Sequence, residues 1–134
     1  MRGVAAKIIF CLVMALGALW VFGPREPASL QIDYRRIAIP DDVDAYLSIA
    51  EARFDDIVPG THKRVSWFGI PGEKTPVAIV YIHGFSASSE ELRPVPDLVA
   101  EALGANLYFT RLTGHGRGSA AMAGADVASW MHDV

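Results

Sequence analysis

Cysteine, net charge and internal repeats are all scarce or missing in this chain. One cysteine, Cys11, occurs among 134 residues, so no disulfide can form within the chain. The 12 Lys and Arg nearly balance the 15 Asp and Glu, which leaves a net charge of -3. Because no basic stripe is interleaved with aromatic residues, the sequence does not indicate a nucleic-acid partner. It contains no repeat or low-complexity tract, and its length allows one domain at most.

Charge is also absent from residues 8–22, an apolar run that follows Arg2 and Lys7 and is ended by a Gly-Pro pair. A buried core helix would normally show a polar face. An uncharged run behind a basic N-terminus is instead typical of a membrane signal. We therefore predict that residues 1–23 form either an uncleaved membrane anchor or a signal peptide.

The length and the bulky end of this run favour the anchor. Helical residues 4–22, with Lys7 reaching back toward the headgroups, approach the ~30 Å thickness of the hydrocarbon core. Cleavage after the small residues at 15–17 would leave apolar side chains at the new N-terminus, whereas Trp20 suits a membrane interface. Basic residues at the N-terminus favour a cytoplasmic start, so we expect the domain on the periplasmic or extracellular face. A cleaved segment would make the protein secreted.

The rest of the chain, residues 24–134, alternates between strand-like and helix-like patterns. Strands are predicted at residues 30–39, 63–70, 77–82 and 106–110, and helices from residue 43, over 95–103 and from 127. Pro96 suits the first turn of its helix, and Gly104 suits the position after its end. The β-branched run at 77–82 is typical of a strand buried on both faces. Alternating strands and helices predict an α/β fold with a mostly parallel sheet flanked by helices.

The strand predicted at 77–82 ends abruptly in residues 83–86, which read His-Gly-Phe-Ser. Gly84 allows a sharp turn and leaves the following backbone N–H groups uncovered. Ser88 and Glu91 then have the Ser-x-x-Glu spacing of a helix start. A strand, a sharp turn and a helix form the geometry that directs backbone donors at an anion that develops during a reaction.

Two motifs resemble those of a known family. Residues 83–86, and the Arg-Leu-Thr-Gly-His-Gly segment at 111–116, are similar to the oxyanion loop and to the loop after the fourth strand of bacterial α/β-hydrolases. The group in question is serine aminopeptidase-like and monoacylglycerol-lipase-like, and the similarity covers residues 46–134. It implies the N-terminal part of an α/β-hydrolase fold behind the membrane segment. The implied activity is that of a serine hydrolase acting on carboxylic esters such as acylglycerols, or on peptides, without a cofactor.

The resemblance also implies roles for single residues. The backbone N–H of Phe85 would be one oxyanion-hole donor, and the residue after the nucleophile would give the other. The alternative is an ordinary turn in which Phe85 packs in the core. The remaining motif residues are expected to shape two loops, with His83, Gly84 and Ser86 in the oxyanion loop, and Gly114, His115 and Gly116 in a loop beside the active site. Of these, His83 would hold its loop by hydrogen bonds from its ring.

The nucleophile of the family is missing from this sequence. In the family it lies in a Gly-x-Ser-x-Gly elbow after the fifth strand, and the acid and the catalytic His follow later. That pentapeptide does not occur here. Ser86 follows the wrong strand and has no identifiable base. The resemblance therefore implies a chain truncated before the elbow, and we expect no catalytic residue in it and no activity from it alone.

Two alternatives stay open. The chain can be a non-catalytic, membrane-anchored α/β module or a truncated remnant, or it can belong to a hydrolase with an Asp nucleophile, as in haloalkane dehalogenases.

In the family order, the third strand lies between the fourth and the fifth, so residues 77–82 would expose an unpaired edge in this chain. Such an edge promotes aggregation.

Metal and nucleotide binding are not indicated. No two of the four histidines have the spacing of metal ligands; they are His62, His83, His115 and His132. The glycines at 114–118 resemble a phosphate loop, but no Lys-Ser or Lys-Thr pair follows them.

Overall fold

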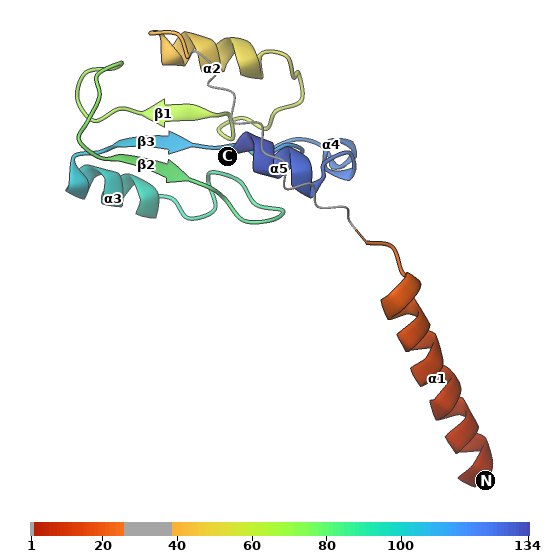
Figure 1. Ribbon diagram of the computed structural model, residues 1–134. Helices are drawn as coiled ribbons and strands as arrows, with labels where there is room; N and C mark the ends of the chain where they lie inside the picture. Colours follow the sequence, from red (N-terminus) through yellow and green to blue (C-terminus); the bar gives the residue numbers. More distant parts are fainter. Residues whose placement is uncertain (1, 26–38) are drawn as a thin grey trace.

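A computed structural model describes residues 2–25 and 39–134. These residues form an N-terminal helix and a small α/β unit. Helix α1 (Arg2–Phe22) is exposed along its length and stands apart from the other elements (Figure 1). Its segment Gly3–Phe22 is long and apolar enough to cross a membrane. Arg25 donates a hydrogen bond to the carbonyl oxygen of Trp20 at 2.8 Å, a common way to satisfy the last carbonyls of a helix. The apolar helix predicted here is confirmed.

The sheet is mixed. Its strands are β1 (Arg64–Ser66), β2 (Ala78–Tyr81) and β3 (Asn106–Phe109), in the order β1-β3-β2. Strand β2 runs parallel to β3, as the alternation of strands and helices predicts, whereas β1 runs antiparallel to it. Of the predicted strands, the one at 63–70 is shorter than expected, and the one at 30–39 lies almost wholly outside the described residues.

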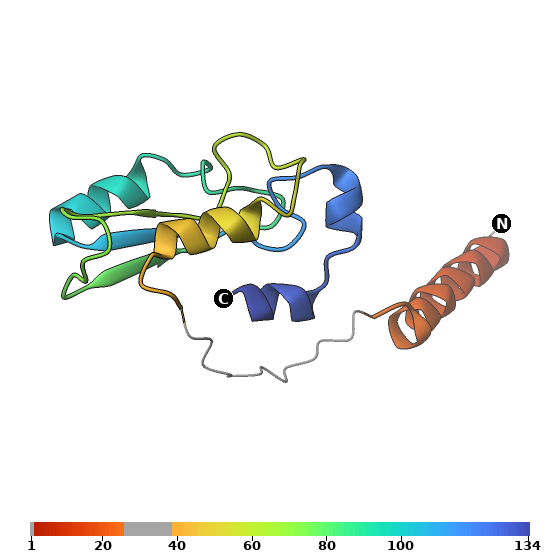
Figure 2. The same ribbon diagram turned by 90° about the horizontal axis from the view of Figure 1, so that it is seen from above.

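One helix packs on each face of this sheet (Figure 2). Helix α2 (Val43–Glu51) lies against β1, and α3 (Val95–Leu103) lies on the opposite face against β3. The first begins at Asp42, whose carboxylate accepts the N–H of Ala45 at 2.9 Å. The second ends at Gly104, which has the left-handed φ of 62°. Two short helices, α4 (Ser119–Ala123) and α5 (Val127–Asp133), follow the sheet; α4 is absent from the sequence prediction.

The core lies between α3 and the sheet. Ala100 of α3 packs on Leu107 and Phe109 of β3, and the half-buried Ile79 and Tyr81 of β2 join them. The rings of Tyr81 and Phe109 meet edge to face, with centroids 5.8 Å apart. Parallel register explains this grouping, because Ile79 is paired with Leu107 and Tyr81 with Phe109.

The prediction that β2 is buried on both faces is wrong. Val80 is 55% exposed and Ala78 is also exposed, whereas Ile79 and Tyr81 point to the core. Two facts explain the difference. Helix α2 packs on β1, at the opposite edge of the sheet, and β2 is the outermost strand among the described residues. The apolar run therefore has one covered and one uncovered face, and its outer edge is unpaired among the described residues.

Candidate functional site

The two loops that carry the sequence motifs meet at one end of the sheet. Because β2 and β3 are parallel neighbours, the loops that follow them leave the same edge. Thr110 joins the two strand ends, since its backbone N–H and its hydroxyl both donate to the carbonyl oxygen of Tyr81, at 3.1 and 2.9 Å. The structure thus brings together all the residues that the sequence singled out in the two motifs.

His83 links the first loop to the second. Its Nε2 accepts the backbone N–H of Leu112 at 3.1 Å, and its Nδ1 lies 3.0 Å from the carbonyl oxygen of Gly84. This pair of contacts requires a neutral ring with its proton on Nδ1. Burial, more than the nearby His115 and Arg111, lowers the pKa of His83 and favours that neutral form. His83 therefore has the loop-holding position that the sequence predicts.

His115 makes the reciprocal link. Its Nε2 accepts the backbone N–H of Ser86 at 3.1 Å, and its Nδ1 lies 3.3 Å from the carbonyl oxygen of Thr113. The ring is buried, and its centroid is 4.7 Å from that of His83. Ser86 contacts this histidine through its backbone N–H. The lone pair of Nε2 is thus occupied, and His115 is not placed to activate the hydroxyl of Ser86.

Between Gly84 and Ala87, one backbone donor has no acceptor among the described residues. Gly84 N–H donates to Oε2 of Glu91 at 3.3 Å, Ser86 N–H to His115, and Ala87 N–H to the carbonyl oxygen of Gly84 at 3.2 Å. The N–H of Phe85, between them, donates to none of the described residues. Its side chain is 75% exposed, so the alternative in which Phe85 packs in the core is wrong.

An open cleft of about 610 Å³ runs along this loop. Its lining comes from three segments: Val58 and Thr61, then Ser86, Ala87, Ser88, Glu90 and Glu91, then Gly116. Gly116 has a φ of 62°, and a Cβ atom there would meet Oγ1 of Thr61 at 2.4 Å. The carbonyl oxygen of Gly116 also accepts the N–H of Val58 at 2.8 Å. Only glycine fits this close approach, which fixes one wall of the cleft.

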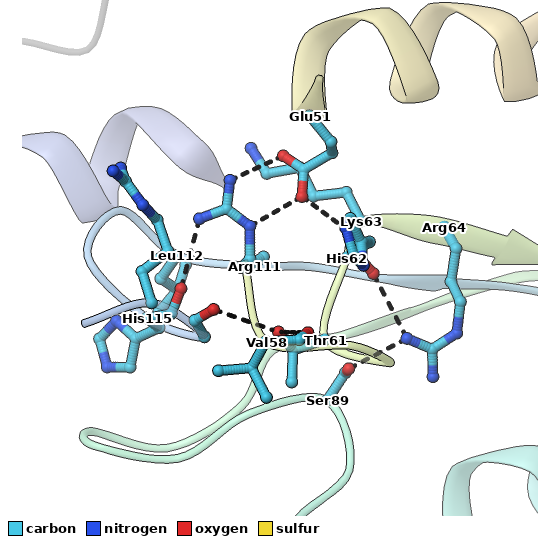
Figure 3. A network of polar contacts seen from close by, with 12 residues as sticks. Glu51, Val58, Thr61, His62, Lys63, Arg64, Ser89, Arg111, Leu112 and His115 are labelled. Atoms are coloured by element: carbon cyan, nitrogen blue, oxygen red, sulfur yellow. Dashed lines mark hydrogen bonds and ion pairs between the residues drawn. The ribbon is translucent and has the colours of Figure 1, made fainter. Parts of the chain in front are cut away.

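A buried ion pair supports the second loop from the other side (Figure 3). Arg111 donates from Nε and Nη2 to the two carboxylate oxygens of Glu51, both at 2.7 Å, and from Nη1 to the carbonyl oxygen of His115 at 3.3 Å. Burial alone would raise the pKa of Glu51, but hydrogen bonds from Arg111 and from the N–H of Lys63 outweigh it, so the pKa is lowered. The pair ties α2 to the loop after β3.

Helix α5 holds the second loop from its C-terminal side. Trp130 donates from Nε1 to the carbonyl oxygen of Thr113 at 2.9 Å, and a carboxylate oxygen of Asp133 accepts both the N–H and the hydroxyl of Thr113. The ring of Trp130 also packs edge to face on Phe85 and His115, with centroids 5.7 and 5.6 Å away. Sequence reasoning missed Trp130, Asp133 and Glu51, because no local motif marks their partners.

Among residues 2–25 and 39–134, no group of three or more His, Cys, Asp or Glu is arranged to hold a metal ion. Both nitrogens of His83 and of His115 already face backbone groups. The site can offer a backbone hydrogen-bond donor to an anion, on a loop that contacts His83 and His115 and lies beside an open cleft. No protein-family model, curated protein or solved structure matches the chain.

Proposed function

We propose that this chain supplies the oxyanion-binding half of an α/β-hydrolase that cleaves carboxylic esters such as acylglycerols, or peptides. The observation that carries the proposal is the backbone N–H of Phe85. It is the one donor between Gly84 and Ala87 that has no acceptor among the described residues. It lies at the carboxyl end of a parallel strand, where α/β folds bind their ligands.

The strand order supports the same proposal. The resemblance assigns β1, β2 and β3 to the second, third and fourth strands of the family, in which the third lies beside the fourth. Here β2 lies beside β3, and its other edge is unpaired among the described residues. That edge and the exposed Val80 offer a place for a further strand, and the family places its fifth strand, which precedes the nucleophile, there.

In the proposed reaction, the carbonyl oxygen of the substrate gains negative charge as the nucleophile adds to it. The Phe85 N–H would donate to that oxygen, and one such donor is worth about 3 kcal/mol of transition-state stabilisation. The nucleophile, its acid and its base come from a part of the domain outside this sequence, whether the nucleophile is Ser or Asp. The proposal includes the location: α1 anchors the domain in a membrane, with the domain outside the cytoplasm.

The test uses the coding sequence that follows Val134. We expect a Gly-x-Ser-x-Gly within about 25 residues, and we expect the longer product to hydrolyse p-nitrophenyl butyrate. In that product, Phe85→Pro removes the N–H donor and should lower kcat by about a hundredfold. Phe85→Leu keeps the donor and controls for loss of the ring.

Equal kcat in the proline and leucine variants would refute the oxyanion role of Phe85. A following sequence with neither a serine nor an aspartate elbow would refute the hydrolase and favour the alternative, a non-catalytic membrane-anchored module.

A further inference from the structure

We propose that His115 is a positioning residue, whose neutral ring, oriented by α5, holds the Phe85 N–H in place as the donor of the site. In this scheme Nε2 of His115 fixes the backbone of Ser86, and the Thr113 carbonyl sets which nitrogen of the ring carries the proton. The functional meaning of this arrangement rests on the proposed hydrolase activity. The hydrogen bonds of His115 themselves do not depend on that activity.

The first step is the backbone conformation of Ser86. Its φ is 60°, in the left-handed region that residues with a Cβ atom seldom adopt. This conformation turns the Ser86 N–H toward His115, where Nε2 accepts it at 3.1 Å. The Phe85 N–H belongs to the preceding peptide, whose Gly84 carbonyl oxygen accepts the N–H of Ala87 and faces Nδ1 of His83. The bond from Ser86 to His115 fixes the next peptide, so both peptides that flank Phe85 are held. Without the acceptor, the left-handed conformation would lose the hydrogen bond that compensates its strain.

The second step is the choice of tautomer. Nε2 can accept only if the proton of the neutral ring is on Nδ1. The carbonyl oxygen of Thr113 lies 3.3 Å from Nδ1 and provides the acceptor for that proton. Trp130 donates to the same carbonyl at 2.9 Å, and Asp133 accepts the N–H and the hydroxyl of Thr113. Helix α5 therefore fixes the group that selects the tautomer of His115.

The surroundings of the ring favour this role over others. A catalytic base needs a free lone pair, and the lone pair of Nε2 faces a backbone donor. Arg111 donates to the backbone carbonyl oxygen of His115, and the carboxylate of Glu51 balances the charge of its guanidinium. The other groups against the ring are the imidazole of His83 and the rings of Phe85 and Trp130. Packing alone would need none of the hydrogen bonds that converge on Thr113 and His115.

The test is nuclear magnetic resonance on the full chain in detergent micelles, with ¹⁵N-labelled histidine and serine. In the wild type, we expect the ¹⁵N shifts of His115 to show a protonated Nδ1 and a bare Nε2. His115→Phe keeps a ring of similar size without an acceptor, and should speed hydrogen exchange of the Ser86 N–H roughly tenfold. His115→Gln places an oxygen near the Nε2 position, and should keep the exchange rate within about twofold of the wild type.

His132→Gln, on the exposed side of α5, is the matched control and should change neither signal. A proton on Nε2 in the wild type overturns the proposal, and so does equal Ser86 exchange in the wild type and the His115→Phe variant. If that variant does not fold, the tautomer of the wild type decides. Because neither readout uses turnover, failure of the proposed hydrolase function leaves this result standing, and the reverse also holds.

Discussion

Removing one partner of the Glu51–Arg111 pair should be among the most damaging substitutions in the described part of the chain. Both side chains are 5% exposed, and two hydrogen bonds of 2.7 Å join them. Glu51→Gln keeps the shape but leaves the guanidinium of Arg111 without a counter-charge. A buried charge that loses its partner costs about 3–5 kcal/mol. That is a large share of the roughly 5–15 kcal/mol by which a domain is stable.

The measurement is urea unfolding of the full chain in non-ionic detergent, followed by near-ultraviolet circular dichroism. Asp97→Asn is the matched control, because it removes the carboxylate from the more exposed Arg93–Asp97 pair and should change stability little. A double variant, Glu51→Leu with Arg111→Met, should regain much of the loss, since replacing both buried charges by apolar groups is often neutral. If Glu51→Gln costs no more than the control, the pair does not support the loop as argued here.

The same pair predicts how stability depends on pH. The folded pKa of Glu51 lies below its ordinary value of 4.5, so the unfolded chain binds the proton more readily. The stability contributed by this group is therefore present above about pH 4.5, and it is lost as the pH falls through the folded pKa. The Glu51→Gln variant should lack this part of the acid sensitivity. An unchanged difference between wild type and variant from pH 6 down to pH 3 would contradict the assignment.

Three further predictions follow from the site, the sheet and α1. The chain ending at Val134 should neither hydrolyse p-nitrophenyl butyrate nor be labelled by a fluorophosphonate probe, because it has no nucleophile elbow; stoichiometric labelling of Ser86 would contradict this. Val80→Lys, on the uncovered face of β2, should reduce self-association in size-exclusion chromatography with light scattering, whereas Ile49→Lys, at an exposed position of α2, should not. The chain should fractionate with membranes at its full intact mass, and a soluble product beginning near Ala18 would show cleavage.

Local signals explain which parts of the fold the sequence predicts. The bounds of α3, residues 95–103, are confirmed because Pro96 and Gly104 mark its two ends. The start of α2 is confirmed because Asp42 caps it. Each of these signals acts within a few residues, so it can be read without knowing the tertiary contacts. The short strand β1 shows the opposite case, since its length depends on where β3 stops pairing with it.

The parts that the sequence did not predict depend on contacts between distant residues. Nothing near Glu51 indicates that its partner is Arg111, 60 positions away. Asp133 and Thr113 are 20 positions apart. The exposure of Val80 depends on which strands and helices surround β2, whereas the composition of its strand indicates only that it is apolar. The family resemblance implies that residues 83–86 and 114–116 border the same site, and in the structure they meet because both follow neighbouring parallel strands.

The use of neutral histidines in these loops has a physical advantage if an anion develops beside Phe85. A carboxylate in place of His115 would also accept the Ser86 N–H. It would, however, place a negative charge near that anion, and two like unit charges about 6 Å apart repel by about 3 kcal/mol at an effective dielectric constant of about 20. That repulsion would cancel the contribution expected from one oxyanion donor. Among the described residues, the carboxylate that accepts a hydrogen bond from the backbone of residues 83–86 is that of Glu91, from Gly84, and Glu91 is exposed, where water screens its charge. A buried imidazole that is neutral fixes the loop without opposing the charge that the site is proposed to stabilise.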